Sequence, residues 1–128
     1  MSNRKNISSG APWEDVVGYS RAVVSGNMVF ISGTASVDEK GNVAGRNIYD
    51  QTQFILQKIG KVLKQVDATF EQVVRTRIFT TDISKWEDIA RAHGEVFKFI
   101  RPATSLVEVK ALIHPDMLVE IEADAVID

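Results

Sequence analysis

The sequence predicts an α+β fold, a two-layer sandwich in which two helices cover one face of a single mixed β-sheet. Two segments carry apolar residues at helical spacing, and shorter runs rich in β-branched and aromatic residues precede, separate and follow them. The predicted order is β-β-α-β-α-β-β, a pattern typical of this class. At 128 residues the chain has room for one core, so residues 1–128 are expected to form a single domain.

The first two predicted strands form a hairpin. Residues 19–24 and 28–33 favour extended structure, and Ser25-Gly26-Asn27 supplies a short turn between them. The polar first dozen residues predict an irregular lead-in. Both alternating faces of residues 28–31 are apolar, which indicates a strand covered on both sides. Since two helices cover one side of the sheet, we expect a second subunit to bury the other.

The first predicted helix begins after Asn47, which suits the N-cap position. Residues 69–72 predict one further helical turn, and residues 73–80 predict a strand. The apolar positions of the helix recur at steps of three and four and therefore share one face; they are Ile48, Thr52, Ile55, Ile59, Val62, Leu63 and Val66.

The second predicted helix opens at Ser84, whose spacing to Glu87 is that of a capping box. Pro102 ends it, because the residue before a proline is driven out of helical geometry. Residues 106–112 and 118–126 predict the last two strands. The apolar stripe of this helix consists of Trp86, Ile89, Ala90, His93, Val96, Phe97 and Ile100.

Composition narrows the functional classes. A formal charge of −2 and a pI near 5.7 give no general attraction to nucleic acid or anionic membranes. The chain has no cysteine, which excludes disulfides, thiolate metal sites and a cysteine nucleophile. No apolar run approaches the ~20 residues that span a bilayer, and the N-terminus lacks a signal-peptide pattern. We therefore expect a cytoplasmic protein with no cofactor, no metal, and no nucleic-acid or membrane partner.

The last predicted strand contains the first candidate catalytic residues. Its period of two places Glu120, Glu122 and Asp124 on one face, opposite an apolar face. This pattern has two interpretations: a solvated polar face, or a cleft in which one carboxylate acts as a general base or positions water.

The two histidines are expected to be structural or solvated. His93 lies on the apolar stripe and predicts a core histidine with one hydrogen bond, whereas His114 falls in a loop. Without an H-x-x-x-H spacing they do not predict a metal site.

Arg75 and Arg77 share one face of a strand that should be central. An arginine there pairs with a carboxylate or meets an anionic ligand, and both interpretations stay open. Glu108 and Glu120 are the expected structural partners.

Several segments together resemble the Rid/YjgF family in order and spacing, from about Tyr19 to Val126. They are Gly18-Tyr19, Gly26-Asn27-Met28-Val29-Phe30-Ile31-Ser32-Gly33, Val73-Val74-Arg75-Thr76, Thr81-Asp82, Pro102-Ala103-Thr104-Ser105-Leu106-Val107-Glu108-Val109 and Val119-Glu120-Ile121-Glu122-Ala123. The resemblance implies a chorismate-mutase-like fold, a homotrimer, and ligand clefts between subunits.

The resemblance also implies a reaction. Catalytic members add water to reactive imines or enamines derived from amino acids, and release a 2-keto acid and ammonia. Carried over position by position, the glutamate associated with the attacking water is Glu120, and the tyrosine and serine that line the cleft are Tyr19 and Ser32.

The chain departs from the family at the arginine of the Pro-Ala-Arg-Ser segment, which clamps the substrate carboxylate. This position is Thr104, and a hydroxyl cannot form the bidentate pair that a guanidinium forms. Arg77 and Arg101 are the candidates to supply a guanidinium from another backbone position.

The first functional hypothesis is a hydrolase or deaminase that acts on a small imine- or enamine-type metabolite with altered specificity. In this hypothesis Glu120 is catalytic, and Tyr19, Ser32, Arg77, Arg101 and Thr104 contact the substrate. The alternative is a non-catalytic trimer that binds a small metabolite. An endoribonuclease, a label attached to some relatives, is disfavoured by the acidic pI and by the lack of a basic stripe with interleaved aromatics.

Overall fold

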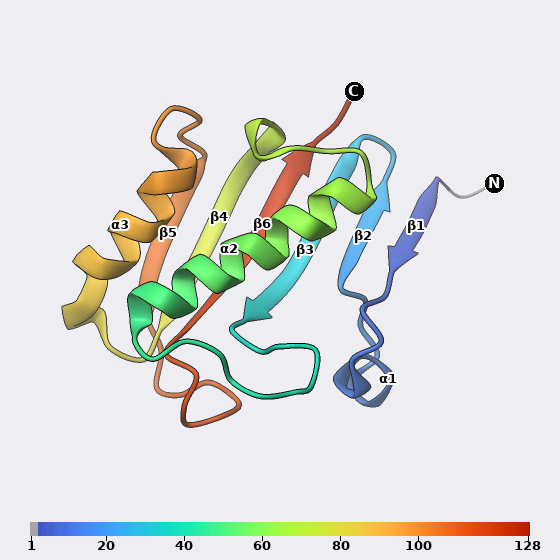
Figure 1. Ribbon diagram of the computed structural model, residues 1–128. Helices are drawn as coiled ribbons and strands as arrows, with labels where there is room; N and C mark the ends of the chain where they lie inside the picture. The colour runs from blue at the N-terminus through green and yellow to red at the C-terminus, as the bar shows by residue number, and fades with distance from the viewer. Residues whose placement is uncertain (1–2) are drawn as a thin grey trace.

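A computed structural model describes residues 3–128 and confirms the predicted α+β class. A single six-stranded mixed sheet has the order β1-β2-β3-β6-β4-β5 (Figure 1). The strands are β1 (Arg4–Ile7), β2 (Ala22–Ser25), β3 (Met28–Ala35), β4 (Val73–Thr80), β5 (Ala103–Glu108) and β6 (Val119–Val126).

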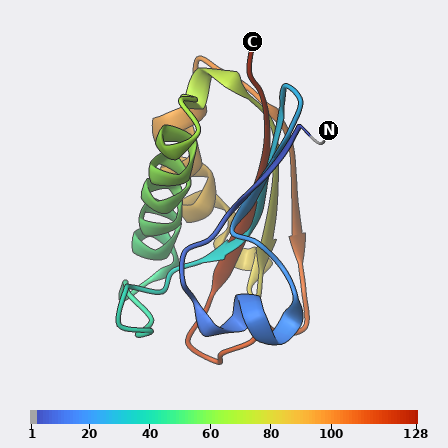
Figure 2. The same cartoon turned by 90° about the vertical axis from the view of Figure 1, so that its right-hand side faces the viewer.

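The two long helices lie on the same side of the sheet (Figure 2). They are α2 (Ile48–Gln65) and α3 (Trp86–Phe97); a short helix, α1 (Pro12–Val17), precedes β2. A 3₁₀ turn at Phe70–Gln72 confirms the predicted helical turn, and a second 3₁₀ turn spans Ile83–Lys85. The side chain of Asn47 accepts a hydrogen bond from the Asp50 N–H at 2.9 Å, which confirms the predicted N-cap of α2.

The central strand β6 organises the sheet. It pairs antiparallel with β3 on one side and with β4 on the other. Strand β5 then pairs parallel with β4, and α3 makes the crossover that a parallel pair requires. The predicted alternation of β6 is confirmed. Its residues Val119, Ile121, Ala123 and Ala125 are fully buried under the helices, whereas Glu120, Glu122 and Asp124 face the other way.

The core lies between the helices and this apolar face of the sheet. The fully buried side chains of Ile55, Ile59 and Leu63 come from one face of α2, and Ile89 comes from α3. The helical spacing of these residues therefore decides which side of each helix packs on the sheet.

A β-bulge interrupts β3 near its end. Ile31 pairs with Ala123 and Thr34 pairs with Ile121, so three steps along β3 match two along β6. The extra residue falls at Ser32-Gly33, opposite Glu122. Bulges bend a strand and re-aim its side chains, and this one lies beside Glu120.

Part of the predicted irregular lead-in is regular structure: among the described residues 3–12, residues 8–11 are irregular, but residues 4–7 form a strand. Arg4–Ile7 adds an edge strand that pairs antiparallel with β2, with Arg4 opposite Ser25 and Ile7 opposite Ala22. Polar and charged residues are common on such an edge, because they discourage pairing with another chain. Polarity alone was therefore a poor guide.

The predicted capping box at Ser84 is wrong. The side chain of Asp82 accepts a hydrogen bond from the Ser84 N–H at 3.1 Å and opens the 3₁₀ turn, so Ser84 already lies inside helical structure. Helix α3 then begins at Trp86 without a side-chain cap, and Glu87 lies in its first turn. An N-cap needs extended backbone geometry, which the upstream Asp82 takes.

The strand after Pro102 begins earlier than predicted. It spans Ala103–Glu108 instead of residues 106–112, because Ala103 already pairs with Arg75 of β4. Pairing with β4 places Ala103 in the strand although alanine has a low intrinsic preference for extended structure.

The sheet face opposite the helices keeps large apolar side chains in contact with solvent. Phe30 of β3 is 44% exposed and Val107 of β5 is 45% exposed. Among residues 3–128, no helix has the length and apolarity needed to cross a membrane.

Truncation of the core should be costly. Ile59 is fully buried between α2 and the sheet, so Ile59→Ala should lower the free energy of unfolding by about 2–5 kcal/mol. Gln57→Ala, on the exposed side of the same helix, should change it by less than about 0.5 kcal/mol. Urea denaturation at one fixed protein concentration measures both; equal losses would place the helix differently from this structure.

Candidate functional site

Glu120 lies on the face of β6 that points away from the helices, and its side chain is half-buried. It pairs with Ala35 of β3 and with Phe79 of β4. Gly33 in the bulge makes room for its carboxylate, because a Cβ at Gly33 would lie 2.5 Å from Glu120 Oε2. The missing side chain at Gly33 therefore permits the observed position of the carboxylate.

Arg21 holds the backbone beside this carboxylate. Its Nη2 donates to the Gly33 carbonyl oxygen at 2.6 Å. The Arg21 guanidinium carbon also lies 5.9 Å from the centre of the Tyr19 ring. β2 pairs with β3 only from Met28 to Ile31. The guanidinium of Arg21 therefore donates to the Gly33 carbonyl oxygen, which lies beyond the end of that pairing.

Ser32 lies in the bulge next to Gly33, and its hydroxyl donates to the Ser20 carbonyl oxygen at 2.7 Å. The structure thus brings Tyr19, Ser32 and Glu120 to one region around Arg21. The sequence analysis did not select Arg21. The available signal was its position two residues after Tyr19, which places both on the same side of an extended segment.

Burial is the main cause of the altered acidity of Glu120. It raises the pKa of this carboxyl, the Arg21 guanidinium opposes the rise, and the Glu122 carboxylate adds to it. A carboxylate with a raised pKa is a better proton acceptor near neutral pH than an ordinary one.

A second cation, Lys58 of α2, donates to carbonyl oxygens a few residues further along the chain from Gly33. Its ammonium donates to the carbonyl oxygens of Ala35 and Val37, both at 2.9 Å. Burial lowers the pKa of Lys58, and the nearby Arg21 lowers it further. Two cations therefore support the backbone where β3 ends.

Thr104 lies on the opposite face of the sheet from Glu120. It pairs with the buried Thr76, and the two hydroxyl oxygens are 2.8 Å apart. Thr76 Oγ1 in turn lies 3.0 Å from His93 Nε2, and the Thr104 hydroxyl donates to the Pro102 carbonyl oxygen at 3.1 Å. Within one chain, Thr104 and Glu120 therefore lie on opposite faces of the sheet.

The hydrogen bond predicted for His93 is confirmed, since Nε2 lies 3.0 Å from Thr76 Oγ1, but the ring lines a pocket at the edge of the core. His93 is half-buried on α3, and its ring lies 4.6 Å from the Phe97 ring, centre to centre. His114 is exposed in its loop, as expected, where its Nδ1 accepts a hydrogen bond from the Asp116 N–H.

Arg77 is engaged in ion pairs on the open face of the sheet. Its Nη1 lies 3.3 Å from a carboxylate oxygen of Glu122 and 3.3 Å from one of Asp124. The predicted partners, Glu108 and Glu120, are wrong, because the register places Arg77 opposite Glu122 and Glu108 accepts from the Ile83 N–H. The Arg77 side chain is 44% exposed, so these pairs contribute little stability.

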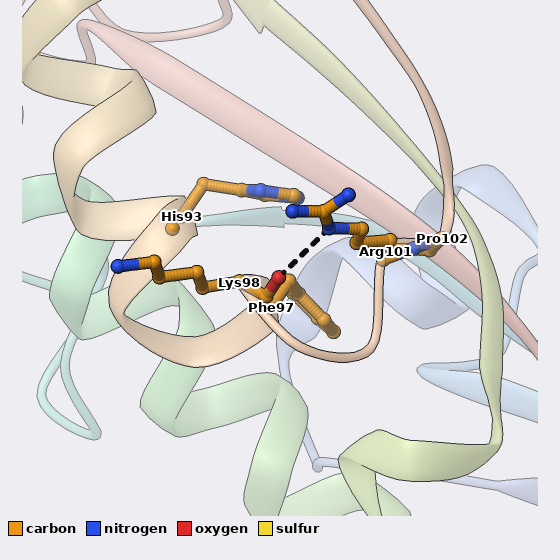
Figure 3. Close-up of a pocket in the computed structure, with 6 residues that line it drawn as sticks. His93, Phe97, Lys98, Arg101 and Pro102 are labelled. Atoms are coloured by element: carbon orange, nitrogen blue, oxygen red, sulfur yellow. Dashed lines mark hydrogen bonds between the residues drawn. The ribbon is translucent and has the colours of Figure 1, made fainter.

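Arg101 lines a pocket of about 380 Å³ between the end of α3 and the start of β5 (Figure 3). Its Nε donates to the Lys98 carbonyl oxygen at 3.1 Å. The structure therefore places the two candidate arginines apart, Arg77 on the open face and Arg101 at the helical layer. Among residues 3–128, no group of three or more His, Asp or Glu side chains could hold a metal ion.

Comparison with known proteins identifies the family to which the fold belongs. The family model described as Endoribonuclease L-PSP matches residues 10–127. The crystal structure of Rv2704 from Mycobacterium tuberculosis, a member of the YjgF/YER057c/UK114 family, is 47% identical, covers 98% of this chain and 100% of its own, and superposes with a TM-score of 0.90.

Two relatives carry informative names. A RutC family protein, PH0854 of Pyrococcus horikoshii, is 32% identical over 84% of this chain and 85% of its own length. The chloroplastic Reactive Intermediate Deaminase A of Arabidopsis thaliana is 32% identical over 73% of this chain and 51% of its own length. The chain belongs to the Endoribonuclease L-PSP family, which is the Rid/YjgF family.

The raised pKa of Glu120 predicts a pH-dependent cost to stability. The folded state binds this proton more tightly than the unfolded chain, so stability falls as pH rises from the ordinary carboxyl pKa through the raised one. Glu120→Gln should match wild type near pH ~4 and be more stable than wild type above pH ~7.

Urea denaturation across this pH range measures the difference. Glu39→Gln, in an exposed turn, is the matched control and should show little change. A Glu120→Gln protein that is less stable than wild type at high pH would contradict the assignment.

Proposed function

We propose that this protein is a Rid-like hydrolase, a deaminase that acts on a small imine- or enamine-type metabolite at a cleft between the subunits of a homotrimer. Water adds across the C=N bond of the imine, and Glu120 accepts a proton from that water. The resulting carbinolamine expels ammonia and leaves a carbonyl compound. The observation that carries the proposal is the half-buried Glu120 carboxylate with its raised pKa, seated between the bulge and Arg21.

Tyr19 and Ser32 are proposed to orient the ligand at this site. Tyr19 is half-buried beside Arg21, and Ser32 is held by its bond to the Ser20 carbonyl oxygen. We add Arg21 to this set, because its guanidinium lies close enough to Glu120 to lower the pKa of that carboxyl.

Two observations support the association of subunits that a homotrimer requires. Thr104 and Glu120 lie on opposite faces of the sheet, so a cleft that contains both needs two subunits. The open face also exposes Phe30 and Val107, and apolar side chains of this size are stabilised when another subunit covers them.

The threonine at position 104 is the reason we propose an altered substrate specificity. Its hydroxyl is already bonded to Thr76 and Pro102, and it cannot replace a guanidinium. Of the two candidate arginines, Arg77 would have to leave Glu122 and Asp124, whereas Arg101 has its terminal nitrogens beside a pocket. We therefore favour Arg101 as the group that holds an anionic part of the substrate.

The first experiment measures ammonia release from 2-iminopropionate generated in situ, above the rate without protein. Glu120→Ala should lower the catalysed rate by a factor of at least about 10². Thr104→Arg should raise activity toward this carboxylate-bearing imine by roughly tenfold or more, because a guanidinium at this position adds a bidentate pair to whatever contact Arg101 makes.

Gln57→Ala serves as the unaffected control, because its side chain is exposed on α2. An active wild type whose rate is unchanged by Glu120→Ala would overturn the role of Glu120. Saturable binding without turnover in all proteins would instead support the alternative, a trimer that binds a small metabolite without catalysis.

A further inference from the structure

The hydroxyl of Thr104 ends a row of three hydrogen-bonded side chains that begins at α3. His93 Nε2 lies 3.0 Å from Thr76 Oγ1, and Thr76 Oγ1 lies 2.8 Å from Thr104 Oγ1. The Thr104 hydroxyl in turn donates to the Pro102 carbonyl oxygen at 3.1 Å. Thr76 is fully buried, whereas Thr104 is exposed on the edge strand β5. The row therefore links the interior of the protein to an exposed hydroxyl.

The three bonds of this row have one direction. A hydroxyl has a single proton, so it donates one hydrogen bond. Because the proton of Thr104 goes to Pro102, the bond between the two threonines is donated by Thr76. Thr76 must then accept from His93, so the Nε2 of this ring carries its proton. Burial lowers the pKa of His93, so the ring is neutral and has one N–H to donate.

Thr104 therefore presents an acceptor to a ligand, not a donor. A hydroxyl oxygen has two lone pairs, and one of them accepts from Thr76. No further partner of this hydroxyl is found within residues 3–128, which leaves the second lone pair open to a ligand. To donate to a ligand, the hydroxyl would have to give up its bond to the Pro102 carbonyl oxygen. An arginine has the opposite character, since a guanidinium has donors and no acceptor.

The charges near Thr104 narrow the kind of donor that suits it. Lys98 and Arg101 line the pocket between the end of α3 and the start of β5, and Figure 3 shows the Arg101 guanidinium directed into it. Their positive charge disfavours an ammonium group at this edge of the sheet. A carboxylate would meet the lone pair of Thr104 and find no bidentate donor there. A primary carboxamide suits both constraints, because it is neutral, planar like a carboxylate, and has N–H donors.

We propose that the substrate group at Thr104 is a primary carboxamide next to the reacting C=N bond, so that the substrates are 2-imino amides instead of 2-imino acids. One N–H of the amide donates to Thr104 Oγ1. Water still adds across the C=N bond and ammonia leaves, which yields a 2-oxo amide. Any anionic part of the substrate that Arg101 holds is a separate group. This inference rests on the proposed function and names the substrate class of its site.

Equilibrium binding of pyruvamide to the full-length protein tests the proposal. Methyl pyruvate is the matched ligand control, because it is also uncharged but has no N–H to donate. Wild type should bind pyruvamide about tenfold more tightly than methyl pyruvate, since one hydrogen bond distinguishes the two ligands. Isothermal titration calorimetry measures both dissociation constants.

Thr104→Val keeps the shape of the side chain and removes its hydroxyl. This substitution should weaken pyruvamide binding by about tenfold and leave the affinities for methyl pyruvate and pyruvate unchanged. Thr104→Ser keeps the acceptor, so this control should retain the preference for pyruvamide. Pyruvamide affinity unchanged in Thr104→Val would overturn the proposal, and so would an equal loss of pyruvate affinity in that variant. A wild type that does not prefer pyruvamide to methyl pyruvate would overturn it too.

The direction of the row has a test of its own. The chain has two histidines, so ¹⁵N NMR of the imidazole nitrogens resolves the tautomer of each. His93 should carry its proton on Nε2. A His93 ring protonated only on Nδ1 would reverse the row, leave Thr104 as a donor, and overturn the proposal.

Failure of this inference and failure of the hydrolase proposal give different results. Ammonia release by Glu120→Ala tests the hydrolase, whereas ligand binding to Thr104→Val needs no turnover. A wild type that prefers pyruvamide but releases no ammonia would keep the assignment of Thr104 and overturn the hydrolase alone. A wild type that releases ammonia through Glu120 but has no preference for pyruvamide would overturn this inference alone.

Discussion

The alternation of side chains along β6 is the constraint on which the rest of this structure depends. β6 is central, so its apolar face, from Val119 to Ala125, must lie under α2 and α3, and its three carboxylates must then face the other way. The position of Glu120 and the ion pairs of Arg77 follow from this register. A shift by one residue would bury three charges and expose the core, which is why no other register competes.

The β-bulge at Ser32-Gly33 turns this general arrangement into a specific site. It ends regular pairing beside Glu120, and Gly33 leaves the space that the carboxylate occupies. Near the end of the strand, Arg21 donates to the Gly33 carbonyl oxygen, and Lys58 donates to those of Ala35 and Val37. The positive charge of Arg21 beside the half-buried Glu120 limits the rise in the pKa of this carboxyl. Arg21 therefore both supports the backbone at Gly33 and affects the pKa of Glu120.

Periodicity predicted the parts of the fold that depend on burial. The faces of α2 and β6 and the cap at Asn47 are confirmed, because each depends on local spacing. Strand β1 and the early start of β5 were missed because pairing with a neighbouring strand, not composition, makes them extended. The start of α3 was misplaced because Asp82 begins helical structure before Ser84. At the site, Arg21 and the opposed positions of Thr104 and Glu120 depend on register and on a bulge, which no local pattern reveals.

The central claim is that Glu120 is a half-buried carboxylate beside the bulge, and that burial raises its pKa while Arg21 partly opposes the rise. A pH titration of the ¹³C signals of the glutamate carboxylates in wild type and Arg21→Gln tests it most directly. Glu120 should titrate above the ordinary range for a glutamate in wild type, and higher still in Arg21→Gln, because the opposing positive charge is lost. A Glu120 signal that titrates in the ordinary range, or that does not respond to Arg21→Gln, would contradict the account.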